Sequence, residues 1–397
     1  MQAFRSRDFR LLWAGQTVSL VGDGAFLIAL GWKTTQVTGR ASSLAILLML
    51  HGLALLTTLL LGGALADRYS RRLLMIASDL TRCATIGALA IADASGHLGY
   101  PLMLALAFVF GLADGFFYPA FGGIVPLVVE SHELASANTL IGISRQGSFV
   151  VGPALAGSIY GLAGSPAVFG FDSATFVVSA ALLALARPRA FTRESTEGTW
   201  RSILDGARYV ASVPWLWIGI GVTSVVLMVA MAPFQALMPK FVEEHFHRGV
   251  GAYGTLFALQ SLGMAIGTVL FGQLQPQSRR IVQIFGFLAL NDLFVIAMAL
   301  SSSFVAGAVF MTVRGVFIGY AISIWGTLLM KQVPESKLAR VTSLDFFGST
   351  GLVPLGYALT AGLSQALTPD TILLVGFSLA AFLWASPLVV PKVRLAA

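Results

Sequence analysis

Long runs of apolar residues alternate with short polar segments along the whole chain. Each run is close to the length of about 20 residues that an α-helix needs to cross a hydrocarbon core of about 30 Å. We predict a helix for every run, because an open strand in lipid would leave backbone groups without hydrogen bonds. The twelve predicted spans are 11–33, 43–66, 73–93, 100–118, 138–161, 167–186, 215–238, 250–273, 281–301, 304–329, 341–362 and 371–390.

The longest polar stretch, 187–212, separates the sixth predicted span from the seventh. At an offset near 205 residues the two sides resemble each other weakly, since segment 63–72 is similar to segment 272–280. Internal repeats of this kind are typical of alternating-access transporters. We therefore predict an all-α membrane protein with two pseudo-symmetric six-helix bundles, 1–187 and 213–397. A cytoplasmic linker, 188–212, with an amphipathic helix joins them.

The composition supports a membrane protein. Of the 397 residues, 56% are apolar and 11% are charged, and the mean hydropathy is +0.83. A soluble protein carries about 25% charged residues, so no soluble core could bury this much apolar surface. The net charge of +7 does not indicate nucleic-acid binding, because the basic residues are scattered in small groups between the apolar runs.

The distribution of basic residues predicts the orientation of the chain in the bilayer. With a cytoplasmic N-terminus, eighteen of the 25 Lys and Arg residues fall on the inner side, four on the outer side and three within spans. Cytoplasmic loops of membrane proteins carry the excess of Lys and Arg. We therefore expect a multi-pass protein of the bacterial inner membrane with both termini in the cytoplasm.

The sequence contains no constellation typical of an enzyme. It lacks the Gly-Lys-Ser loop that binds phosphates and any paired metal-ligand motif, and Cys83 is its single cysteine. We expect neither a cofactor nor a metal ion. The energy for any transport must then come from an ion gradient.

The loop after the second span carries the most specific motif. From Gly62 to Arg72 it reads GGALADRYSRR. This resembles the Gly-x-Leu-x-Asp-Arg-x-x-Arg-Arg signature of the major facilitator superfamily. The resemblance covers essentially the whole chain, and it implies the two-bundle fold and a loop that latches the outward-facing state. An incidental acid in a basic cytoplasmic loop is the alternative interpretation.

A second element lies in the fifth span. Its residues resemble the Gly-Pro-x-x-x-Gly element of exporter branches, and Pro153 should bend the helix while the small residues allow close packing. Ordinary tolerance of Gly and Pro in membrane helices is the competing explanation. Together with the loop motif, the element resembles the macrolide-efflux and multidrug proton-antiporter branch. The residues of the element are Gly147, Gly152, Pro153 and Gly157.

Several ionisable residues lie near the predicted cytoplasmic ends of the spans. A charge inside a bilayer costs about 2.5 to 3.5 kcal/mol, so each one needs a partner or a water-filled cavity. We predict a cytoplasmic gate network, and a static cluster that only orients the helices is the alternative. The predicted network comprises Gly63, Asp67, Arg68, Arg71, Arg72, Asp79, Arg82, Asp114, Arg145 and Asp345.

Two other ionisable residues lie near the middle of the bilayer. Asp23 stands in the first span, which lines the central cavity in the family that the chain resembles, and His51 lies at similar depth in the second. A carboxyl group there can take up and release a proton as the cavity changes sides. His51 can share that proton or be a hydrogen-bonded packing residue. Asp292 and Arg314 are expected to neutralise each other.

Aromatic, methionine and amide side chains in the spans that line the family's cavity predict a large hydrophobic ligand of variable shape. Many of these side chains will instead face lipid or neighbouring helices. The predicted cavity residues are Gln16, Phe26, Phe149, Met231, Phe234, Gln235, Gln260, Arg314, Tyr320 and Phe346.

Taken together, the sequence predicts a monomeric secondary active transporter with alternating access. Its partners are protons, the bilayer and a small amphipathic substrate, such as a drug or a natural product, which it exports by proton antiport. A lipid, lysolipid or siderophore exporter on the same scaffold is the first alternative. The second is a membrane receptor or scaffold that moves no substrate.

Overall fold

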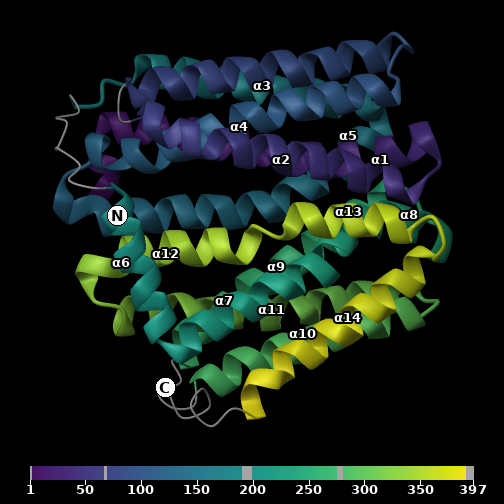
Figure 1. Cartoon of the computed structure of the whole chain (residues 1–397). Helices are drawn as coiled ribbons and strands as arrows, with labels where there is room; N and C mark the ends of the chain where they lie inside the picture. The colour runs from purple at the N-terminus through teal and green to yellow at the C-terminus, as the bar shows by residue number, and fades with distance from the viewer. Residues whose placement is uncertain (1, 67–68, 190–198, 275–279, 390–397) are drawn as a thin grey trace. The chain divides into compact units, whose positions relative to one another are not determined.

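The computed structural model describes residues 2–66, 69–189, 199–274 and 280–389, and these residues form helices and no strand. Figure 1 shows the helices in chain order. The first part of the chain contains η1 (Gln2–Arg5), α1 (Arg7–Thr38), α2 (Ala41–Ala66), α3 (Arg71–Ala94), α4 (Tyr100–Val128), η2 (Ser131–Glu133) and α5 (Leu134–Leu185). The second part contains α6 (Thr199–Ser212), α7 (Pro214–Val226), the π-helical turn η3 (Leu227–Met231), α8 (Ala232–His245), α9 (Val250–Leu274), α10 (Arg280–Leu300), α11 (Phe304–Gln332), α12 (Glu335–Thr350), α13 (Val353–Leu363), α14 (Pro369–Ala385) and η4 (Ser386–Val389).

Eleven stretches of the described residues are long and apolar enough to cross a membrane. One of them, Ser131–Leu185, has 55 residues and is divided at Gly164, where φ is 77° and ψ is 179°. Glycine adopts this positive φ without strain, so the helix can stop there and start again. Two spans therefore lie in α5, and the predicted total of twelve membrane-spanning helices is confirmed.

The chain forms two compact units. The first comprises Met1–Glu194 and Arg248–Ala258, and the second comprises Ser195–His247 and Leu259–Ala397. Of the predicted linker, residues 190–198 lie outside the described part, and α6 occupies the remainder after them. In the first unit α1 and α3 pack against α5, and α2 packs against α4; in the second, α10 packs against α11 and α14.

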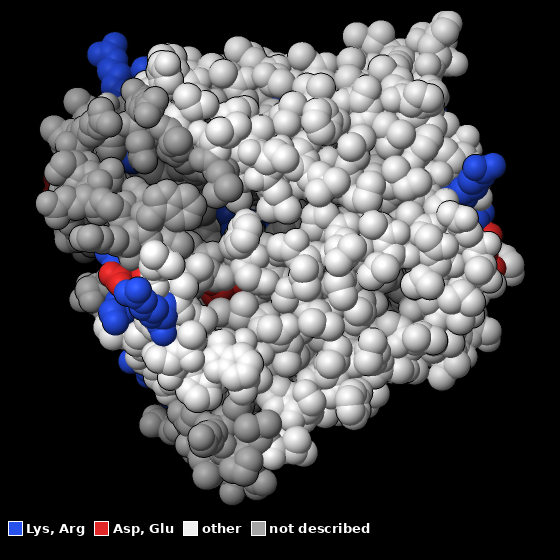
Figure 2. Space-filling view, viewed as in Figure 1, with Lys and Arg blue, Asp and Glu red and all other residues white. Residues whose placement is uncertain are grey.

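Apolar side chains cover much of the outer surface. On the face shown in Figure 2, most of the visible surface is formed by uncharged residues, and charged side chains lie mainly near its edges. Large apolar side chains such as Leu162, Ile91 and Phe382 are 90%, 71% and 69% exposed. Such exposure would be unfavourable in water, and it fits a surface that contacts lipid tails.

Glycines bring two helices into backbone contact in each unit. A Cβ atom at Gly111 or Gly115 of α4 would collide with backbone carbonyl groups of α2. In the second unit, Gly315 and Gly319 of α11 pack in the same way against α9. The two pairs are 204 residues apart (315 − 111 and 319 − 115). The repeat predicted from the sequence therefore includes a shared mode of helix packing, the small-residue contact that is common between membrane helices.

Gly319→Ala is expected to lower the stability of the folded protein, because its Cβ would strike the carbonyl oxygen of Met264. Overpacking of this kind costs about 1–3 kcal/mol. Gly326→Ala on the same helix is the matched control, since nothing lies within 4 Å of that position. The midpoint of thermal unfolding in detergent should fall for the first variant and stay the same or rise for the second. Equal midpoints would show that the close contact between α9 and α11 does not contribute to the stability of the folded protein.

Candidate functional site

A buried arginine occupies the interior of the first unit. Arg82 on α3 is 3% exposed. Its Nη2 lies 2.5 Å from Oδ1 of Asp79, and its Nη1 lies 3.4 Å from Oδ1 of Asp114. The guanidinium carbon lies 4.0 Å from the centre of the Phe117 ring and 4.6 Å from that of Phe176. Carboxylates and aromatic faces together compensate the loss of water around this charge.

Hydrogen bonds extend this ion pair across the unit. Oδ2 of Asp79 accepts a hydrogen bond of 2.7 Å from Ser179, whose hydroxyl oxygen accepts one of 3.2 Å from Gln16. At the other end, Oδ2 of Asp114 lies 3.1 Å from Nε2 of His51. This chain of side chains, which we call the buried network, consists of Gln16, His51, Asp79, Arg82, Asp114 and Ser179. It links all five long helices of the unit, α1 to α5.

Asp23 lies beside the buried network without joining it. Its side chain is partly exposed, and no hydrogen bond or ion pair connects it to another described residue. It interacts electrostatically with Arg82 and Asp114. The glycines on either side, Gly22 and Gly24, are buried against α5. Close packing of the two glycines therefore fixes the backbone that carries this carboxyl group.

A fourth carboxyl group, Asp172 on α5, was not among the predicted site residues. It is completely buried, and its Oδ1 accepts a hydrogen bond of 3.3 Å from Thr175. Its Oδ2 has no hydrogen-bond partner in the described ranges of the chain. A Cβ at Gly22 would touch its carboxyl group, so Asp172 lies next to the Asp23 backbone. The sequence signal that could have identified it is an acid in the middle of an apolar span.

The two arginines of the loop motif bind backbone carbonyl groups. Arg71 donates a hydrogen bond of 2.6 Å to the carbonyl oxygen of Gly123 on α4. Arg72 donates bonds of 2.9 Å and 2.5 Å to Leu183 and Ala184 in the last turn of α5. The last carbonyl groups of a helix lack partners within it and attract cations. Arg71 and Arg72 thus attach the start of α3 to its neighbours.

The remaining predicted gate residues are dispersed. Arg145 is exposed and forms no hydrogen bond or ion pair with a described residue. Asp345 accepts a hydrogen bond of 3.0 Å from Nε1 of Trp325 in the second unit. Asp67 and Arg68 lie outside the described residues, and Gly63 lies near the end of α2.

The exporter-like element packs by its small residues. Gly152 contacts the backbone of Gly24 so closely that a Cβ would collide with it, and Pro153 is buried beside it. A Cβ at Gly157 would lie 3.2 Å from the Cα atom of Gly251, which belongs to the same unit. Gly147 has open space around it.

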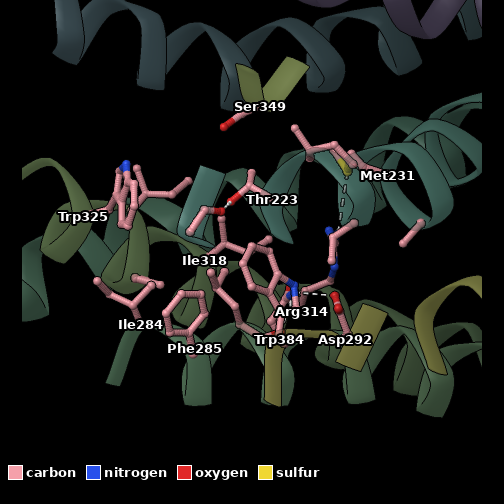
Figure 3. Close-up of a pocket in the computed structure, with 18 of the residues that line it drawn as sticks. Thr223, Met231, Ile284, Phe285, Asp292, Arg314, Ile318, Trp325, Ser349 and Trp384 are labelled. Atoms are coloured by element: carbon pink, nitrogen blue, oxygen red, sulfur yellow. Dashed lines mark hydrogen bonds between the residues drawn. The ribbon is translucent and has the colours of Figure 1, made fainter. Parts of the chain in front are cut away.

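The second unit encloses a cavity of about 370 Å³. Its wall is mostly apolar and aromatic, with contributions from Phe285, Phe377 and Trp384. Figure 3 shows Arg314 and Asp292 near Met231, whereas Trp325 lies at the opposite side of the cavity. Cavities of this composition, apolar with a few converging polar groups, are typical of sites for small molecules.

Arg314 is held in place at the polar side of this cavity. Its Nη1 donates a hydrogen bond of 2.5 Å to Oε1 of Gln260, and its guanidinium carbon lies 4.6 Å from the centre of the Phe234 ring. Asp292 interacts electrostatically with Arg314, although no ion pair within 4 Å joins the two. Asn291 donates a hydrogen bond of 2.6 Å to Asp292. Asn291 was not among the predicted site residues, although its amide also stands inside an apolar span.

The predicted cavity residues do not all lie in one place. Met231, Gln260 and Arg314 line the cavity of the second unit. Phe26 is buried against Phe110 and Phe169, and Tyr320 packs against Phe271 and Phe287. Gln235 accepts a hydrogen bond from Tyr357. Phe149 and Phe346 are 48% and 65% exposed.

Known proteins of similar sequence are exporters. The chain is 27% identical over 372 residues to the enterobactin exporter EntS of Citrobacter koseri, covering 91% of this chain and 86% of that protein. It is 24% identical over 359 residues to macrolide efflux protein A of Streptococcus pyogenes, covering 89% of this chain and 88% of that protein.

Solved structures of transporters share the fold. A bacterial homologue of the iron transporter ferroportin in its inward-facing state has a TM-score of 0.73 at 15% identity, and the match covers 96% of this chain and 98% of that one. The nucleoside transporter NupG has a TM-score of 0.72 at 13% identity with the same coverage. A sequence model described as the Major Facilitator Superfamily matches residues 12–356. The chain therefore belongs to the Major Facilitator Superfamily, as its loop motif indicated, and it is a multi-pass membrane transporter and not an enzyme.

Proposed function

We propose that this transporter exports amphipathic small molecules in exchange for protons. The names of similar proteins support the direction of transport, because both the enterobactin exporter and macrolide efflux protein A move molecules out of cells. The basic residues on the predicted inner side support an inner-membrane location with both termini in the cytoplasm.

The observation that carries the proposal is the excess of carboxyl groups inside the first unit. Asp23, Asp79, Asp114 and Asp172 interact electrostatically with one guanidinium, that of Arg82. If all four were ionised, the unit would bury a large net negative charge, which is strongly unfavourable in a membrane interior. Bound protons would remove this imbalance.

Asp23 is the best candidate for the group that exchanges the proton. It is partly exposed and has no hydrogen-bond partner among the described residues, whereas Asp79 and Asp114 are buried in ion pairs. When Asp23 loses its proton, its negative charge competes with Asp79 and Asp114 for Arg82. Because the buried network links five helices, this competition can shift the equilibrium between two packing arrangements of the unit.

Asp23→Asn is expected to reduce proton-driven export to the background of protein-free vesicles, because the amide side chain cannot take up or release the proton. The measurement is the movement of ethidium across proteoliposomes under an imposed pH gradient. Asp93→Asn is the matched control, since Asp93 belongs to the same unit but pairs with Lys33 at 2.6 Å, apart from the buried network. Undiminished gradient-driven transport by Asp23→Asn would remove this residue from the coupling mechanism.

His51→Gln tests whether the imidazole shares the proton. Glutamine can still donate a hydrogen bond to Asp114, but it cannot take up or release a proton. We expect the transport rate to depend less on pH in the variant, because its amide cannot share the proton. An unchanged pH profile with unchanged rate would identify His51 as a packing residue.

Siderophore export on the same scaffold is a second candidate, and the similarity to the enterobactin exporter is compatible with it. The two candidates differ in what the purified protein binds. Competition between a cationic dye and an iron chelator for binding to the protein in detergent would distinguish them.

A further inference from the structure

The polar side of the cavity in the second unit contains groups whose hydrogen bonds are incomplete. Oδ2 of Asp292, Oδ1 of Asn291 and Nε of Arg314 are buried and have no hydrogen-bond partner within the part of the chain that the structure describes. The three residues Asp292, Asn291 and Arg314 are only 2%, 4% and 2% exposed, and all three line the cavity. A buried polar atom without a partner is unfavourable, so a ligand that completes these hydrogen bonds binds more tightly than one that does not.

The missing bonds define the polar part of such a ligand. The two free oxygen atoms accept hydrogen bonds, and the free guanidinium nitrogen donates one. A hydroxyl group can donate to either oxygen and accept from the nitrogen. Asp292 and Arg314 are an acid and a base that interact electrostatically, and a neutral ligand adds no charge beside them. A cation or an anion would bring an uncompensated charge into an apolar cavity.

The walls define the apolar part. Phe285, Phe377, Trp325 and Trp384 provide aromatic surface, and the volume of about 370 Å³ is large enough for a fused two-ring system. Aromatic rings pack favourably against one another in offset or edge-to-face arrangements. The cavity therefore suits a flat molecule with aromatic character.

The backbone at the cavity supports a binding role. Leu227, Ala230 and Met231 belong to the π-helical turn Leu227–Met231 and line the cavity. A π turn is rare and is frequently found at functional sites, because it displaces side chains from their usual places on the helix. Sulfur in Met231 lies 4.0 Å from Nη2 of Arg314, so the turn contacts the polar side directly.

We propose that this cavity is a binding pocket, contained within the second unit, for a neutral hydroxylated aromatic molecule. Its hydroxyl group donates a hydrogen bond to Asp292 or Asn291 and accepts one from Arg314, and its ring system lies against the aromatic walls. The pocket extends the proposed export function. The proposal rests on that function in one point only, namely that the bound molecule is also the exported one.

Binding to the purified full-length protein in detergent tests the proposal, with 2-naphthol, naphthalene, 2-naphthoate and 2-naphthylmethylamine as probes. The wild-type protein should bind 2-naphthol at least about tenfold more tightly than naphthalene, since naphthalene leaves the polar atoms unpaired. The anion and the amine cation should both bind more weakly than 2-naphthol. Equal affinities for 2-naphthol and naphthalene would mean that water alone satisfies the polar groups, and would overturn the proposal.

Two variants show where the probe binds. Ala321→Phe places a ring in the cavity and should abolish the binding of 2-naphthol, whereas Leu290→Phe, at a position 43% exposed on α10, should leave it unchanged. Asp292→Asn removes the charge that balances Arg314, so the variant should prefer 2-naphthoate to 2-naphthol. A merely structural role of Asp292 would not reverse this preference.

The thermal unfolding midpoint of each variant shows whether it is folded. Asp292→Asn keeps the shape of the side chain, so it tests the proposal even if Ala321→Phe does not fold. Retention of 2-naphthol binding by folded Ala321→Phe would overturn the proposal. The binding assay uses no ion gradient, so a failure of proton-driven transport would leave its result intact. Conversely, loss of the pocket would not contradict proton coupling in the first unit.

Discussion

A guanidinium placed inside a lipid-embedded bundle must be compensated by other side chains, and Arg82 meets this constraint with Asp79, Asp114 and two aromatic rings. Asp79 lies on α3 itself, whereas Asp114 and Phe117 lie on α4 and Phe176 lies on α5. The requirement to neutralise one charge therefore also sets the rotation of α3 and α4 and of the second half of α5. Removing one member of a buried ion pair is strongly unfavourable because it leaves the other charged and unpaired. The arrangement of the first unit therefore depends on this interaction, and the other polar contacts of the buried network extend it.

The sequence predicts the spans well because the length and polarity of a membrane helix are local properties. Gly164 even marks the division between the fifth and sixth spans, where its positive φ separates two helices. The sequence analysis placed Asp79, Arg82 and Asp114 in one network, but it could not predict the individual hydrogen-bond partners of these side chains. In an almost wholly apolar helix the hydrophobic pattern does not show which face is buried, so the hydrogen bond between Asp79 and Ser179, 100 positions apart, has no signal in the sequence. For the same reason, the sequence did not indicate that Asn291 lines a cavity.

The two units use one helix scaffold with opposite placement of charge. In the first unit the buried arginine stands on α3 and an acid, Asp114, on α4. In the second, the buried acid Asp292 stands on α10 and the arginine, Arg314, on α11, which carries the glycines equivalent to those of α4. The first unit has more acids than bases in its interior, whereas Asp292 and Arg314 balance in the second. We base the two proposals on this asymmetry: proton exchange in the first unit, and binding of a neutral ligand in the second.

The π-helical turn Leu227–Met231 also affects how the seventh span should be aligned with its counterparts. A π turn accommodates one residue more than an α turn, and one residue corresponds to a rotation of about 100° in an α-helix. Beyond Met231, the faces of α8 are therefore shifted by one position relative to α7. A relative whose seventh span is a regular α-helix should match this chain only if a single-residue gap is placed in the turn, and Phe234 would otherwise be assigned to the wrong face.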